Sequence, residues 1–184
     1  QGFTALQRSD AYRDVVPYYL LQIEFHEGNY RYVVENGGKL VQRAVPERRR
    51  ELERVIAESW FRLGDFNRTI EHLDAFTAAG GELDRDGSYL MGFSLYRTAR
   101  YPEAAEYLRR ACGAEDALTQ NASYHLADCY LRAGDKRAAM HAFAMAADDR
   151  FDATIAEDAL FNYGKLQYEL GAGAFNGAIN VLTR

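Results

Sequence analysis

A short turn recurs through this chain at an almost constant interval, and this repetition constrains the fold more than any other feature. The turn residues follow one another every 35 to 37 positions, at Gly28, Gly64, Ala99, Gly134 and Gly171. Fixed periods of this length are typical of stacked supersecondary units that share one continuous core. We therefore read the 184 residues as five repeat units with a short lead-in, rather than as one globular domain.

Each turn lies between two helical patterns. Small and apolar residues occur at i, i+1 and i+4 before the turn, as at Ile56, Ala57 and Trp60. The same spacing follows the turn, and residues at this spacing share one face of a helix. The small residue lets a neighbouring backbone approach, and the glycine permits a tight helix-to-helix turn. Ala and Leu also outnumber Val and Ile, which favours helices over strands. The pattern predicts an all-α chain of antiparallel helix pairs.

The repeat also predicts where units and joints lie. Pro17 is expected in the first turn of a helix, Asp84 or Asp86 is expected to cap another, and Gly37-Gly38 should interrupt the second helix of the first unit. We expect one continuous array, 1–184, with the end of a preceding unit at 1–16 and five units at 17–46, 47–81, 84–115, 118–150 and 155–184, the last truncated.

With these positions in place, the sequence resembles the tetratricopeptide repeat family, whose unit is a helix–turn–helix of about 34 residues. The resemblance extends over residues 15–184 and is clearest in the third and fourth units. It implies a right-handed superhelical solenoid of antiparallel helix pairs. It rests on the family's small position in the first helix, which is occupied by Ala57, Gly92, Ala127 and Gly164, and in the second helix, which is occupied by Ala104, Ala139 and Ala178.

Composition and motifs exclude several classes of function. A net charge of −5 and a pI near 5.4 argue against a nucleic-acid-binding surface. No segment has the roughly 18 apolar residues of a membrane-spanning helix. No nucleotide-binding or hydrolase motif occurs, so we predict no enzyme and no cofactor. His125, Asp128 and Cys129 form one cluster of metal-ligand types, which we interpret as structural, and no metal site is predicted.

Aromatic residues follow the first helices in two rows. One row is Tyr18, Tyr89, Tyr124 and Phe161, and the second lies two helical turns later at Phe25, Phe61, Tyr96, Leu131 and Tyr168. In the family that the chain resembles, this side lines the concave groove where partners dock. We expect the earlier row to be the more exposed, and the later row could equally fill space between helices. The predicted peptide- or partner-binding residues are Tyr18, Tyr89, Phe93, Tyr96, Tyr124, Asp128, Phe161, Lys165 and Tyr168.

These features predict a protein–protein interaction scaffold that binds a peptide or partner helix in an aromatic concave groove. The Asn and Lys/Arg pattern with which some family members hold acidic chaperone tails is missing, so that function is not predicted. Two alternatives stay open. The chain could be a structural spacer or self-association module that forms a homo-oligomer, or a regulatory domain of an enzyme outside this chain.

The runs at 124–130 and 157–163 look like those of long repeat proteins of the Bacteroidetes. That resemblance implies a bacterial protein and favours the periplasm or cell envelope over the cytoplasm. The fifth unit stops before its second helix is complete. Since solenoid ends normally carry a polar capping helix, we expect the chain to be part of a longer repeat protein.

Overall fold

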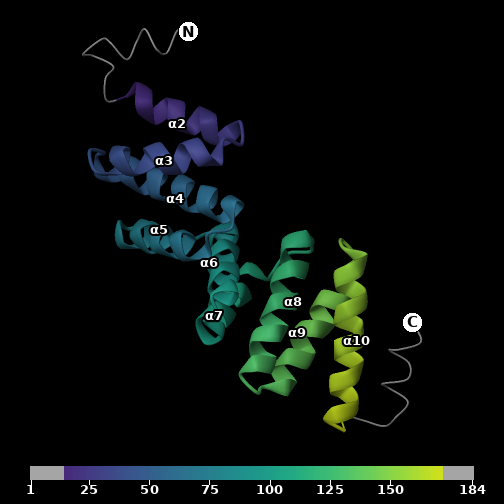
Figure 1. The fold of residues 1–184 in the computed structure, drawn as a ribbon. Helices are drawn as coiled ribbons and strands as arrows, with labels where there is room; N and C mark the ends of the chain where they lie inside the picture. The colour runs from purple at the N-terminus through teal and green to yellow at the C-terminus, as the bar shows by residue number, and fades with distance from the viewer. Residues whose placement is uncertain (1–14, 172–184) are drawn as a thin grey trace. The chain divides into compact units, whose positions relative to one another are not determined.

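The computed structural model describes residues 15–171, which form nine α-helices and no strand (Figure 1). The predicted all-α fold is confirmed. The predicted lead-in and the second helix of the fifth unit lie outside the described residues, apart from Val15 and Val16. The helices are α2 (Val16–His26), α3 (Tyr30–Val41), α4 (Pro46–Leu63), α5 (Phe66–Ala78), α6 (Arg85–Arg97), α7 (Tyr101–Ala111), α8 (Ala117–Arg132), α9 (Lys136–Asp148) and α10 (Ala153–Glu169).

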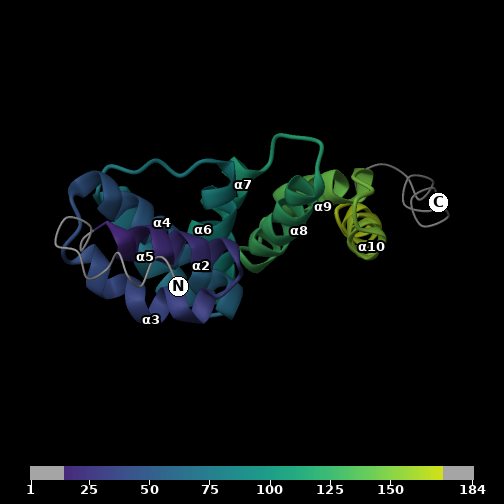
Figure 2. The same ribbon diagram turned by 90° about the horizontal axis from the view of Figure 1, so that it is seen from above.

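The chain divides into two compact units, Gln1–Leu83 and Asp84–Arg184. We call these two compact parts unit 1 and unit 2, which are distinct from the five repeat units predicted above, and we describe each by itself. Unit 1 holds the pairs α2/α3 and α4/α5, and unit 2 holds α6/α7, α8/α9 and α10. In both views of the ribbon, α8, α9 and α10 lie side by side, and all three pack against one another (Figure 2).

The predicted turns are confirmed by their backbone conformation. Gly28, Gly64 and Gly134 have φ angles of 80°, 81° and 80°, and Ala99 adopts the same left-handed region at 62°. At each turn two amides bond back to the end of the preceding helix. At Gly134, for example, the amide donates to Leu131 at 3.0 Å and the next amide donates to Tyr130 at 2.9 Å. This arrangement satisfies carbonyls that would otherwise lack partners at a helix end.

Aspartates begin the first helix of each pair in unit 2. Asp84 accepts a hydrogen bond from the amide of Gly87, Asp116 from that of Thr119, and Asp152 from those of Thr154 and Ile155. A carboxylate at this position pairs with amides that have no partner inside the helix. The predicted cap at Asp84 is therefore confirmed, as is Pro17 in the first turn of α2.

Close approach of the paired helices explains the small residues. Ala57 and Ala127 are fully buried, and a Cβ on Gly92 would lie 2.8 Å from the backbone nitrogen of Leu108 on α7. The expected interruption at Gly37-Gly38 is wrong, since α3 runs through both glycines. Gly37 is buried where a Cβ would come within 2.6 Å of Ile56 Cδ1, so it serves the packing of α3 on α4.

Candidate functional site

Unit 2 presents a repeated set of side chains at i, i+4 and i+7 on its three first helices, and we call this set the aromatic face. Residues at this spacing lie on one side of a helix. Because α8 packs beside both α6 and α10, the three sets are neighbours. Eight of the nine predicted binding residues belong to this face, and Tyr18 belongs to unit 1. The face comprises Tyr89, Phe93 and Tyr96 on α6, Tyr124, Asp128 and Leu131 on α8, and Phe161, Lys165 and Tyr168 on α10.

His125 lies at the centre of the α6–α8 part of the face. Its ring is 4.9 Å from that of Phe93, 4.8 Å from that of Tyr96 and 5.5 Å from that of Tyr124, measured between ring centroids. Burial lowers the pKa of His125 to about 4, so the imidazole is neutral at physiological pH. Its Nδ1 is buried without a hydrogen-bond partner in the described part of the chain. The histidine that sequence spacing placed in a ligand-type cluster therefore serves as part of an aromatic packing group.

Tyr96 and Arg132 converge on one carboxylate. The Tyr96 hydroxyl donates to Oδ2 of Asp128 at 2.9 Å, and Arg132 Nε donates to the same oxygen at 2.8 Å. Burial and the hydrogen bond to Asp128 raise the pKa of Tyr96 to about 12. The Arg132 guanidinium also lies over the ring of Tyr101 at 4.7 Å. Asp128 is thus a joining residue between α6 and α8, and its carboxylate is already engaged by two donors.

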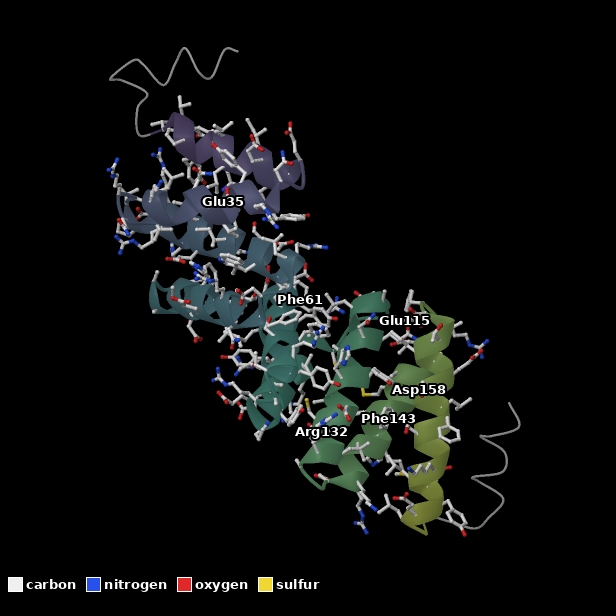
Figure 3. All side chains as sticks on the ribbon, viewed as in Figure 1. Glu35, Phe61, Glu115, Arg132, Phe143 and Asp158 are labelled. Carbon is white, nitrogen blue, oxygen red and sulfur yellow. The ribbon has the colours of Figure 1, made fainter. Side chains whose placement is uncertain are left out.

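Tyr124 makes the corresponding link from α8 to α10. The acceptor is Asp158, which lies on α10 and is labelled in Figure 3. The Tyr124 hydroxyl donates to its Oδ2 at 2.5 Å, and Asn162 Nδ2 also donates to that oxygen, at 3.1 Å. The hydrogen bond to Asp158, followed by burial, raises the pKa of Tyr124 to about 12. The ring lies edge-on to the buried Phe143 of α9 at 5.8 Å. Tyr124 is therefore half-buried in the packing between helices.

Tyr18 repeats this arrangement inside unit 1. Its hydroxyl donates to Glu51 of α4, and the guanidinium of Arg48 lies 5.4 Å over its ring. Burial and the contact with Glu51 raise the pKa of Tyr18 to about 12. The acceptor follows its tyrosine by 33 residues here, by 32 for Tyr96 and by 34 for Tyr124. An acidic residue roughly one period after each tyrosine was the sequence signal that could have found these acceptors.

The two aromatic rows do not differ in exposure as expected. Tyr18, Tyr89 and Tyr124 of the earlier row are half-buried, and so are Tyr96 and Leu131 of the later row. For Tyr18, Tyr96 and Tyr124 the reason is that the hydroxyl bonds to the neighbouring first helix, which draws the ring into the packing. Exposure depends instead on the helix, since Phe161 of the earlier row and Tyr168 of the later row both lie on α10 and are both exposed.

On α10 the face is open. Phe161 is 58% exposed and Tyr168 is 64% exposed, and Lys165 lies exposed between them in sequence. The three occupy one side of the helix at i, i+4 and i+7. They present two large rings and one positive charge in a line about two helical turns long. Among the described residues, these three are the most exposed members of the aromatic face.

The described residues offer little other chemistry. Between residues 15 and 171, His, Cys, Asp and Glu side chains form no group of three or more that could hold a metal ion. Cys129 is 1% exposed, and burial raises the pKa of its thiol to about 12, which makes it a poor nucleophile. Within the same range no helix is both long and apolar enough to cross a membrane.

Comparison with known proteins supports the predicted helix–turn–helix repeat. Residues 121–149, which span most of α8 and α9, match the sequence model of the family described as Tetratricopeptide repeat. Among curated protein sequences none matches the chain.

Solved structures share the fold at low sequence identity. YrrB, described as "a TPR protein with an unusual peptide-binding site", superposes with a TM-score of 0.75 at 15% identity, over 100% of this chain and 90% of its own. MamA gives 0.66 at 17% identity, with 89% and 90% of the two chains covered. BtubC from P. vanneervenii gives 0.61 at 15% identity, with 99% and 86% covered.

The helix pairs, the left-handed turn residues and the buried small positions all follow the pattern that carries the resemblance. The fold prediction is confirmed: the chain is an α-helical solenoid of the tetratricopeptide repeat type.

Proposed function

We propose that this chain is a scaffold that binds a peptide or partner helix on the aromatic face of unit 2, with no catalytic step of its own. The observation that carries the proposal is the exposed line of Phe161, Lys165 and Tyr168 on α10. Large aromatic rings offer much apolar area at little cost in conformational entropy, and such rings dominate binding energy at protein interfaces.

The chemistry of the face indicates what the partner carries. The hydroxyls of Tyr96 and Tyr124 already donate to Asp128 and Asp158, so these residues present ring surface to a ligand. Lys165 adds a positive charge between the two exposed rings of α10. We therefore expect a segment whose apolar side chains cover Phe161 and Tyr168, with an acidic residue near Lys165. An exposed ion pair of this kind contributes about 0.2–1 kcal/mol, so the rings supply most of the affinity.

The comparison with YrrB agrees with this proposal, since that protein is described as having a peptide-binding site and has the same fold. At 15% identity the likeness concerns the fold. The choice of binding residues therefore rests on the side chains of unit 2 and on their exposure.

The proposal is tested by selecting peptides against the chain and locating where they bind. A displayed library of random peptides is selected on the immobilised protein, and the best peptide is added to ¹⁵N-labelled protein. We expect the largest amide shift changes on α10, with smaller ones on α6 and α8. A version of the peptide with its apolar residues replaced by serine is the control and should cause none. Shift changes centred on α5, α7 or α9 would show that binding uses another surface.

A sedimentation experiment on the chain alone accompanies this test. If α10 is instead covered by a second copy of the chain, the weight-average mass rises with concentration and Phe161→Ala abolishes the rise. That outcome would replace the peptide-binding proposal with self-association.

A further inference from the structure

At one position of the repeat, the side chain contacts the connection that follows its own helix pair. The residues at this position are Arg50, Arg85 and Gln120, which are spaced by 35 and stand at or near the start of α4, α6 and α8. Arg85 Nε donates to the carbonyl of Ala111, and Gln120 Nε2 donates to that of Ala146, and both acceptors lie 26 residues further along the chain. The same geometric role is thus repeated in consecutive pairs.

Gln120 holds the connection between α9 and α10. Its side chain is fully buried, and its amide nitrogen lies within hydrogen-bond distance of the carbonyls of Ala146, Asp149 and Asp152, at 3.2, 2.7 and 3.1 Å. Its amide oxygen accepts from the backbone nitrogen of Asp152 at 2.7 Å. One uncharged side chain therefore bonds backbone donor and acceptor groups at both ends of the connection, at Asp149 and Asp152.

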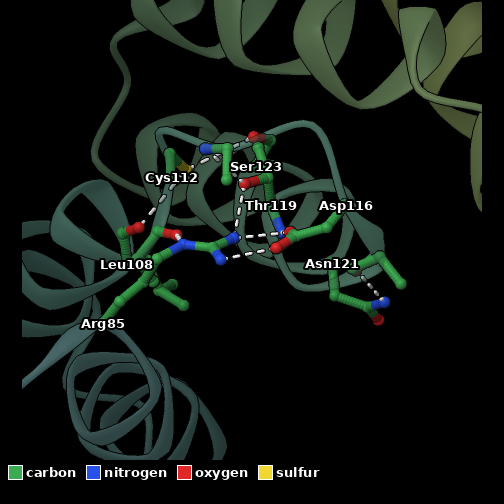
Figure 4. A network of polar contacts seen from close by, with 10 residues as sticks. Arg85, Leu108, Cys112, Asp116, Thr119, Asn121 and Ser123 are labelled. Atoms are coloured by element: carbon green, nitrogen blue, oxygen red, sulfur yellow. Dashed lines mark hydrogen bonds and ion pairs between the residues drawn. The ribbon is translucent and has the colours of Figure 1, made fainter.

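Arg85 holds the connection between α7 and α8 through an ion pair with Asp116 (Figure 4). Besides Ala111, its guanidinium donates to both carboxylate oxygens of Asp116 at 2.5 Å and to Thr119 Oγ1 at 2.7 Å. Thr119 Oγ1 in turn accepts from the amide of Ala114 in the connection. The pair holds the pKa of Asp116 well below its usual range. A bidentate arginine–carboxylate pair fixes both distance and orientation.

The position is weaker in unit 1. Arg50 reaches the carbonyl of Gly80 at the longer distance of 3.4 Å. One period earlier stands Val15, which has no polar group to offer.

We propose that this repeat position is a clamp, in which a polar side chain fixes the joint between one helix pair and the next. The two clamps of unit 2 differ in kind. The joint at Arg85 depends on an ion pair whose side chains are 31% and 40% exposed, so it weakens as salt is added. The side chain of Gln120 is buried and neutral, so its hydrogen bonds should not respond to salt. Together, α6, α8 and α10 form one surface. Each joint therefore determines separately how rigidly its two helix pairs are held within that surface. This inference is independent of the proposed binding function.

The clamp is tested by hydrogen–deuterium exchange of the whole chain, read separately over residues 112–116 and 149–152. Gln120→Leu keeps a similar volume and removes every side-chain hydrogen bond, so exchange over 149–152 should rise at least about tenfold. Exchange over 112–116 should change much less. Asn121→Leu is the matched control, because Asn121 bonds within its own helix, to Ala117, and should leave both segments unchanged.

Arg85→Leu gives the reciprocal result and keeps the test decisive if Gln120→Leu does not fold. Exchange over 112–116 should rise and exchange over 149–152 should stay close to that of the unaltered protein. Raising NaCl from about 0.05 to 1 M should speed exchange over 112–116 in the unaltered chain, and it should not do so in Arg85→Leu. Equal changes at both joints in each variant, or no change at the joint of the altered residue, would overturn the clamp.

Discussion

The Tyr124 hydroxyl and the Asp158 carboxylate, one repeat apart, are joined by a 2.5 Å hydrogen bond between α8 and α10. Tyr96 and Asp128 make the same link between α6 and α8. A tyrosine in such a row therefore has two roles, since its ring contributes to a surface and its hydroxyl holds adjacent helix pairs together. The two roles can be separated by changing the hydroxyl alone.

Tyr124→Phe should lower the free energy of unfolding by about 0.5–1.5 kcal/mol, because it removes one hydrogen bond and keeps the ring. The value should lie near the lower end, since Asp158 is exposed and Asn162 remains as a donor to it. Urea unfolding measures the change. Tyr32→Phe, on the exposed side of α3, is the control and should stay within about 0.5 kcal/mol of the unaltered protein. Equal losses in the two variants would show that the Asp158 contact is not stabilising.

Stability should fall at alkaline pH through the bonded tyrosines. Tyr18, Tyr96 and Tyr124 have their pKa raised from 10.0 to about 12, so folding favours the neutral phenol. Their stabilising contribution is fully present below pH 10 and is lost as pH rises from 10 toward 12. Unfolding free energies measured between pH 9 and about 11.5 should fall less steeply in Tyr124→Phe than in Tyr32→Phe. Identical slopes would mean that the ionisation of Tyr124 is not linked to folding.

Two glycine-to-alanine changes should have opposite effects. Gly92→Ala places a Cβ 2.8 Å from the backbone nitrogen and the Cγ of Leu108, so it should destabilise by about 1–3 kcal/mol. Gly38→Ala meets nothing within 4 Å inside α3 and should stabilise by about 0.5–1 kcal/mol, because alanine is the better helix former. Thermal unfolding gives both values. A stabilising Gly92→Ala would contradict the close approach of α6 and α7.

Ala99→Gly should stabilise the chain modestly. Ala99 has a φ of 62°, and the other described residues with positive φ are all glycines. Relief of left-handed strain is worth about 1–2 kcal/mol, and the entropy that glycine adds to the unfolded chain offsets about 0.4–1 kcal/mol of it. The reverse change, Gly64→Ala, should destabilise. Unfolding free energies that fail to move in opposite directions would argue against a left-handed turn at Ala99.

The fold could be predicted from the sequence because its determinants are local and repeat. The turn residues and the small residues before each turn recur every 35 to 37 positions, so each repeat unit reinforces the assignment of the next. The exception is Gly37, because a glycine pair predicts a helix break and α3 runs through it. Its role is a close approach to Ile56, and a contact between residues 19 apart has no local signature.

The site was predicted less completely. Spacing alone placed Phe161, Lys165 and Tyr168 on one side of a helix, and it grouped Phe93, Tyr96 and Asp128, which the structure brings together. It did not reveal that Tyr124 is half-buried, because that depends on the partners Asp158 and Phe143. Spacing favoured a structural role for His125 but did not identify its aromatic neighbours, because they come from two helices.

The most direct test of the proposed function compares two double variants for affinity to one selected peptide. Phe161→Ala with Tyr168→Ala removes the exposed rings of the aromatic face, and Met145→Ala with Phe151→Ala removes two other exposed apolar side chains, 47% and 53% accessible. By isothermal titration we expect the first variant to raise Kd at least about tenfold, which is about 1.4 kcal/mol, and the second to leave it within about twofold. Equal effects of the two variants, or no effect of the first, would contradict binding at the aromatic face of α10.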